Sequence, residues 1–142
     1  MKKLLLLGML VTGIFSLDAA AQGIGKLRTN ANEQPEWGPR GYDRADYYYF
    51  PDMEVYYNVP QKQYVYQESG KWKFSATLPA KYGKYDLYKS YKVVMNENKP
   101  YMHHNKNKTR YASYRGKKDQ PVRRDQGRDD RNNDNRKDNN KH

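Results

Sequence analysis

Cysteine is absent from this chain of 142 residues, so it can form no disulfide and has no thiolate to serve as a nucleophile or metal ligand. Small exported domains commonly rely on disulfides because their hydrophobic cores are small. A lipid anchor that needs a cysteine after a signal cleavage site is excluded as well. Packing alone, or a partner, must therefore stabilise any folded domain.

Histidine is also scarce, since the only three are His103, His104 and His142. Adjacent residues of a strand point to opposite faces, so His103 and His104 are poorly placed to hold one metal ion. The chain has no zinc-ligand spacing and no glycine-rich phosphate loop. We expect a protein that is not an enzyme and that has no metal site and no cofactor, with a carboxylate pair in a cleft as the one arrangement left open.

Aliphatic side chains and phenylalanine are few after residue 21, a composition typical of disordered chains. Tyrosine compensates for them. Thirteen of the fifteen tyrosines lie between Tyr42 and Tyr101, where their rings can be buried while their hydroxyls stay in contact with water. A core built from these residues must be aromatic, and a body of residues 42–104 would bury only about 60% of its unfolded surface.

The first 21 residues have the three parts of a secretory signal peptide: Lys2 and Lys3, the apolar run 4–17, and the small residues 19–21. The apolar run is shorter than the roughly 20 residues that a transmembrane helix needs. We expect cleavage before Gln22 and a mature chain without a transmembrane segment. It would be exported to the periplasm, the cell surface or the medium of a Gram-negative bacterium.

Composition then divides the mature chain into a linker (22–41), a small tyrosine-rich β domain (42–104) and a disordered basic tail (105–142). The net charge is +3 over residues 22–104 and +7 over residues 105–142. Trp37 is the one large aromatic residue of the linker, and we expect it to fold back over an edge of the domain.

The predicted fold class is mainly β, a small antiparallel meander of four to six short strands with one short helix or turn. Strands are expected at 54–59, 63–67 and 71–75, at 91–95, and as a closing edge at 100–102, with a tyrosine-bearing turn or helix between 79 and 91. The expected core consists of Val55, Tyr57, Tyr64, Tyr66, Trp72, Phe74, Leu78, Leu87 and Val93.

The aromatic residues exceed what so small a core can enclose, and amphipathic rings at a surface are favourable contact material. We therefore expect a binding module whose aromatic β surface contacts an envelope protein or a cell-surface glycan. Its oligomeric state stays open. The candidate contact residues are Tyr47, Tyr48, Tyr49, Tyr56 and Trp72.

The alternative is a structural or surface-adhesive protein in which the basic tail does the binding. Lysines and arginines near tyrosines are typical of segments that bind anions, here glycan, lipid headgroups or extracellular DNA, although interspersed aspartates weaken the field. The candidate residues are Arg110, Arg115, Lys117, Lys118, Arg123 and Arg124.

The body resembles a small uncharacterised domain of exported proteins from Bacteroidota-type bacteria. The resemblance covers about residues 46–104, and it rests on five short motifs at residues 47–51, 55–58, 64–66, 70–72 and 78–79, followed by Lys99-Pro100-Tyr101 with His103 or His104. That family has no established activity, so the resemblance implies an exported domain and no catalytic residues.

Overall fold

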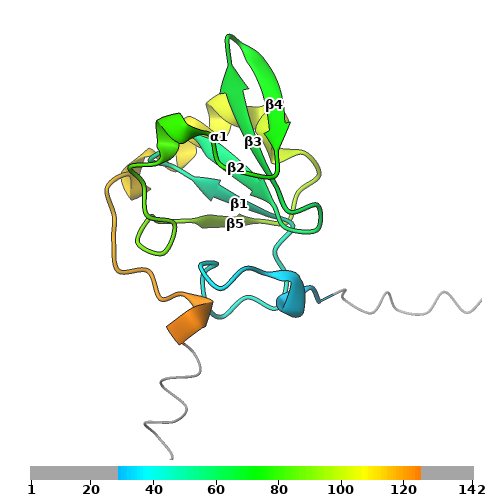
Figure 1. Ribbon diagram of the computed structural model, residues 1–142, viewed down its shortest axis with the longest axis vertical. Coiled ribbons are helices and arrows are strands. Elements are labelled where there is room, and N and C mark those ends of the chain that lie inside the picture. Colours follow the sequence, from blue (N-terminus) through cyan, green and yellow to red (C-terminus); the bar gives the residue numbers. More distant parts are fainter. Residues whose placement is uncertain (1–28, 126–142) are drawn as a thin grey trace, which may run out of the picture.

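The computed structural model describes residues 29–125, in which one antiparallel sheet carries most of the buried hydrophobic side chains. Its strands are β1 (Tyr47–Phe50), β2 (Val55–Asn58), β3 (Gln63–Glu68), β4 (Lys71–Ser75) and β5 (Val93–Met95). The order across the sheet is β4-β3-β2-β1-β5, so four consecutive strands form a meander and β5 returns to pair with β1 (Figure 1). The predicted fold class is confirmed.

The three strands expected across 54–75 are β2, β3 and β4, and all three predictions are confirmed. The β3–β4 hairpin closes through Ser69 and Gly70, whose φ angles are both positive, 49° and 71°. Two positive φ angles define the type I′ turn, which matches the twist of the paired strands. This turn sets the register that places Glu68 opposite Lys71.

The helical elements are short: η1 (Ala31–Glu33), η2 (Ala80–Tyr82), η3 (Pro100–His103), α1 (His104–Arg110), η4 (Ala112–Tyr114) and η5 (Arg123–Asp125). The closing edge strand expected at 100–102 is wrong, because η3 occupies that place. Lys99 turns the chain with a φ of +48°, and Pro100 then starts the helical turn. Proline favours that position because its missing N–H would have no partner there.

One face of the sheet, the Trp37 face, is covered by residues from both sides of the meander. Its buried cluster includes Tyr48, Phe50, Val55, Tyr57 and Tyr64, and Trp37, Leu78, Tyr82, Tyr85 and Leu87 pack against it. The Trp37 ring lies 4.9 Å from the Tyr57 ring and 5.7 Å from that of Tyr48, between ring centroids. Trp37 thus folds back as expected, but over a face of the sheet and not over an edge.

The opposite face, the α1 face, is buried as well. Its cluster consists of Tyr47, Tyr49, Tyr56, Val65, Met95 and Tyr101, with Trp72, Val93 and Tyr111 packed against it. In Figure 1 the yellow segment that carries α1 lies behind the strands. All residues of β1 and β2 are therefore buried, whichever face of the sheet they point to. The alternation of residue types did not predict this double covering.

Two members of the expected core are placed differently. Phe74 is wrong as a core residue, because its side chain is 51% exposed, and Trp72 is only partly buried. Both belong to β4, which is the edge strand, so the covering layer over the centre of the sheet does not enclose them. Val55, Tyr57 and Tyr64 are buried as expected. The remaining four residues are partly buried and pack against one of the two clusters: Tyr66, Leu78, Leu87 and Val93.

The boundaries drawn at residues 41 and 104 are wrong for the part of the chain that the structure describes. Residues 36–40 and 121–124 run side by side, with the Arg40 N–H donating to Pro121 O at 3.0 Å and the Arg123 N–H donating to Gly38 O at 2.9 Å. Figure 1 shows these blue-cyan and orange segments next to each other. Residues 29–41 and 105–125 are thus folded parts of the domain, and residues 1–28 and 126–142 lie outside the described residues.

Candidate functional site

Three of the five aromatic contact residues expected from the sequence cannot touch a ligand in this structure. Tyr48, Tyr49 and Tyr56 are fully buried, because each strand face on which they lie is covered. The prediction is wrong for these three. Tyr47 and Trp72 differ from them in that each borders a surface cavity.

Most of the expected anion-binding residues of the tail have partners within the domain. Arg115 Nη2 lies 2.7 Å from Glu54 Oε1, and Lys118 Nζ lies 3.4 Å from Asp52 Oδ2. The Arg124 guanidinium stacks 4.0 Å above the Tyr88 ring. Lys117 and Arg110 lie over Tyr114 and Tyr111 in the same way. Arg115, Lys118 and Arg124 thus attach the segment to the domain, whereas Arg110 and Lys117 contact tyrosines of the segment itself.

The exposed aromatic surface lies instead where β4 meets η3. Phe74 and Met102 are 51% and 65% exposed, and between them Tyr101 contacts both Phe74 and Trp72, with ring centroids 5.7 and 5.4 Å apart. We call these four residues, Trp72, Phe74, Tyr101 and Met102, the β4–η3 surface. Sequence reasoning assigned Phe74 to the core and did not select Tyr101 or Met102. The position of β4 at the sheet edge is the feature that exposes Phe74.

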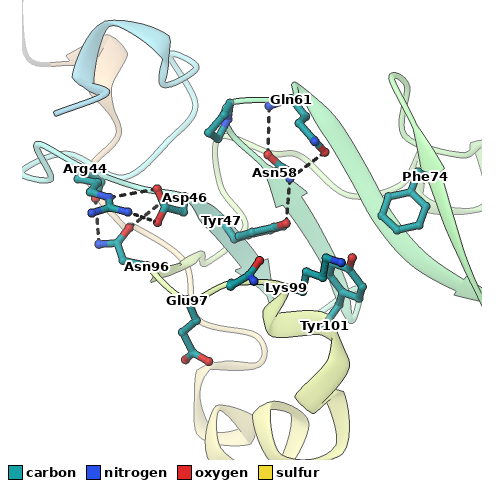
Figure 2. A pocket seen from close by; sticks show the side chains of 12 residues that line it. Arg44, Asp46, Tyr47, Asn58, Gln61, Phe74, Asn96, Glu97, Lys99 and Tyr101 are labelled. Atoms are coloured by element: carbon teal, nitrogen blue, oxygen red, sulfur yellow. Dashed lines mark hydrogen bonds and ion pairs between the residues drawn. The ribbon is translucent and has the colours of Figure 1, made fainter. Parts of the chain in front are cut away.

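A cavity of about 550 Å³ opens beside this surface. Figure 2 shows Phe74 on one side of it, Arg44, Asp46 and Asn96 on the opposite side, and Asn58 and Gln61 between them. Tyr47 and Tyr101 complete its lining together with residues 96–99, which follow β5. A second cavity, of about 350 Å³, lies on the other side of Tyr101 and is lined by Trp72, Met102 and residues 103–106.

Hydrogen bonds fix the polar side chains of the larger cavity. The Asn58 amide donates to the Tyr47 hydroxyl at 2.9 Å and to Gln61 Oε1 at 3.1 Å, and its Oδ1 accepts the Gln61 N–H. Asn96 Oδ1 accepts the Asp46 N–H at 2.9 Å. These side chains are preorganised by their neighbours, so a ligand would not have to order them.

A separate polar network lies under α1. His104 Nδ1 is 3.1 Å from the Tyr56 hydroxyl and its Nε2 is 3.5 Å from Glu54 Oε2, an order that resembles a proton relay. Burial lowers the pKa of His104 more than the charge of Glu54 raises it, and burial raises the pKa of Tyr56. Tyr56 is fully buried, whereas His104 also lines the 350 Å³ cavity, and the hydrogen bond between them attaches α1 to the sheet.

The same network predicts how stability depends on pH. The pKa of His104 is lower in the fold than its ordinary value of 6.5, so the unfolded chain binds the proton more tightly. The contribution of neutral His104 to the free energy of unfolding is therefore fully present above pH 6.5, and it decreases as the pH is lowered below that value. Burial alone would raise the pKa of Glu54, but Lys108, Arg115 and His104 together lower it below 4.5, so its contribution is lost only at more acidic pH.

Thermal unfolding measured between pH 8 and pH 4 checks that the His104 contribution is lost before the Glu54 contribution as the pH falls. The melting temperature should begin to fall near pH 6.5 in the natural chain, and His104→Gln should flatten the curve above pH 4.5 while the more acidic decline remains. An unchanged slope in His104→Gln would show that another group is responsible.

Within the described residues we searched for metal-ligand clusters and for helices able to span a membrane. No group of three or more histidine, aspartate or glutamate side chains within residues 29–125 is placed to hold a metal ion. Over the same range, every helix is too short or too polar to cross a lipid bilayer. The absence of a cofactor stays a prediction.

No known family model, curated protein or solved structure matches this chain. The resemblance to an exported domain of Bacteroidota-type bacteria therefore stays a hypothesis, and the functional argument rests on the geometry alone.

Proposed function

We propose that the chain is an exported, non-enzymatic binding module of a bacterial cell envelope, and that the β4–η3 surface is its contact surface. The observation that carries this proposal is the exposure of Phe74 and Met102 next to Trp72 and Tyr101. A protein of this size has little reason to leave large apolar side chains together at its surface unless they contact a partner. The cavities on either side of Tyr101 give that partner a shaped site.

The export of this module is proposed from the signal-like pattern of residues 1–21, which lie outside the described residues. The alternative function, adhesion through the basic tail, is less favoured because the carboxylates of Glu54 and Asp52 offset the charges of Arg115 and Lys118. Residues 126–142 contain further arginines and lysines, so the experiment includes a chain without them.

Sedimentation of the protein with the envelope fraction of the producing bacterium tests both functions. Phe74→Ala combined with Met102→Ala should reduce the bound fraction about ten-fold, because both side chains lose their contact area. Tyr42→Ala is the matched control, since Tyr42 is 45% exposed and lies outside the β4–η3 surface. A chain that ends at Asp125 should bind as the full chain does.

Binding that survives the double substitution would overturn the proposal. If binding is lost on ending the chain at Asp125 and falls steeply with salt, the tail is the contact. Protein recovered from the same envelope fraction should have the intact mass of a chain that begins at Gln22. Recovery of the full-length chain in the inner membrane would contradict export.

A further inference from the structure

Another hollow, of about 450 Å³, adjoins the 550 Å³ cavity, and we call the two together the groove. The two hollows share Arg44, Asp46 and Pro60 in their walls, and the second is completed by Thr29, Asn30 and Glu33. Each hollow has the volume of an ordinary small-molecule site, about 300–1,000 Å³. Because the two hollows adjoin each other, they suit a ligand made of several linked units better than one compact ligand.

The lining of the groove includes five amide side chains and three aromatic rings. Asn58, Gln61, Asn96 and Asn98 line one hollow with Phe74 and Tyr101, and Asn30 lines the next. Within residues 29–125 the Gln61 NH₂ and the Asn98 amide have no hydrogen-bond partner, so they are available to a ligand. An amide offers both a donor and an acceptor, which is what a hydroxyl group needs from its neighbours.

The groove differs in charge from the rest of this basic chain. Arg44 and Asp46 form an ion pair at 2.7 Å and so largely cancel each other. The remaining charged groups of the wall are Glu33, Glu97 and Lys99, two carboxylates against one ammonium group. A chain with a net charge of +11 therefore has a groove without excess positive charge, which disfavours nucleic acids and other polyanions as its ligand.

Aromatic rings next to preorganised amides fit the chemistry of a sugar. A pyranose ring presents hydroxyl groups at its rim and C–H groups on its face, and the latter pack against an exposed aromatic ring. Phe74 supplies such a ring at one wall of the groove, and Figure 2 shows the Asn58 and Gln61 amides at the adjoining wall.

We propose that this groove binds an uncharged polysaccharide chain, with Phe74 against one sugar ring and the amides of Gln61 and Asn98 at its hydroxyl groups. This assignment rests on the proposed function as a binding module and names the class of ligand. The second hollow, lined by Asn30 and Glu33, accepts the adjoining sugar units of the same chain.

Retention of the full chain on beads that carry laminarin, yeast mannan or xyloglucan tests the assignment, with alginate beads as the anionic comparison. Retention on at least one neutral polysaccharide should be the same at about 0.1 and 0.5 M NaCl, since no charge pair drives it. Phe74→Ala should weaken it about ten-fold, and Asn98→Ala should weaken it with no change in melting temperature. Tyr42→Ala should leave it unchanged.

Retention on none of the neutral polysaccharides, or retention on alginate alone with a steep loss in salt, overturns the glycan assignment. The proposed function has a separate readout. If the protein sediments with envelopes in a manner that depends on Phe74, and soluble laminarin, mannan and xyloglucan do not compete, the binding module stands and its partner is an envelope protein. If sedimentation does not depend on Phe74, the proposed function itself fails.

Discussion

Trp37→Ala should lower the melting temperature of the protein by about 12–24 °C. The indole packs on Tyr48, Phe50 and Tyr57 and closes the Trp37 face of the sheet. Removing a packed tryptophan costs about 3–5 kcal/mol, and we take the lower value because Trp37 is partly buried. A small domain loses about 4–8 °C per kcal/mol.

The matched control for Trp37→Ala is Phe74→Ala, which also removes an aromatic ring. Phe74 is 51% exposed on the edge strand, so its removal should change the free energy of unfolding by less than about 1 kcal/mol. Differential scanning calorimetry of both variants gives the comparison. Equal shifts in the two variants would contradict the assignment of Trp37 to the core.

The second large effect concerns the C-terminal segment. A chain that ends at His104 should show no cooperative unfolding transition, whereas one that ends at Asp125 should unfold as the full chain does. Residues 105–125 supply Asn107, whose amide donates to the Tyr56 hydroxyl at 3.3 Å and to Pro100 O at 2.9 Å. They also supply Tyr111, which packs 6.1 Å from Tyr49 between ring centroids.

Loss of this segment would expose Tyr49 and Tyr56, two of the largest fully buried side chains. It would also remove the Lys108 and Arg115 partners of Glu54. Glu54 has a φ of +56°, a conformation that costs a residue other than glycine about 1 kcal/mol or more, and it is held by these contacts. Circular dichroism over a thermal ramp decides between the two lengths. A cooperative transition in the chain that ends at His104 would show that residues 42–104 fold alone.

The strand pattern was predictable because its signals are local. Alternating residues in β2, β3 and β4, with turn residues between them, define each strand over a few positions, and Ser69-Gly70 sets the hairpin register. The covering of the second sheet face was not predictable in this way. Tyr56 looks like a solvent-facing residue until α1 is placed against it, and no period in residues 105–125 indicates that contact.

The candidate site illustrates the same limit. The sequence selected β1 and β2 aromatics as contact residues because it shows how many rings there are, but not which strand lies at the edge. In the sheet order, β1 and β2 are central and β4 is at one end, so Tyr48 and Tyr49 are enclosed while Phe74 is exposed. The basic residues of the tail were misread for a related reason, since their carboxylate partners Asp52 and Glu54 lie more than fifty positions away along the chain.

By itself, the sequence therefore determined a cysteine-free, tyrosine-rich antiparallel meander, because strand alternation and turn chemistry act between neighbouring residues. Only the tertiary structure decided which rings are buried, how far the folded domain extends on both sides of the meander, and where a ligand can bind. Those properties depend on contacts between segments such as 36–40 and 121–124, whose pairing is stabilised by backbone hydrogen bonds that carry no signature in the residue types.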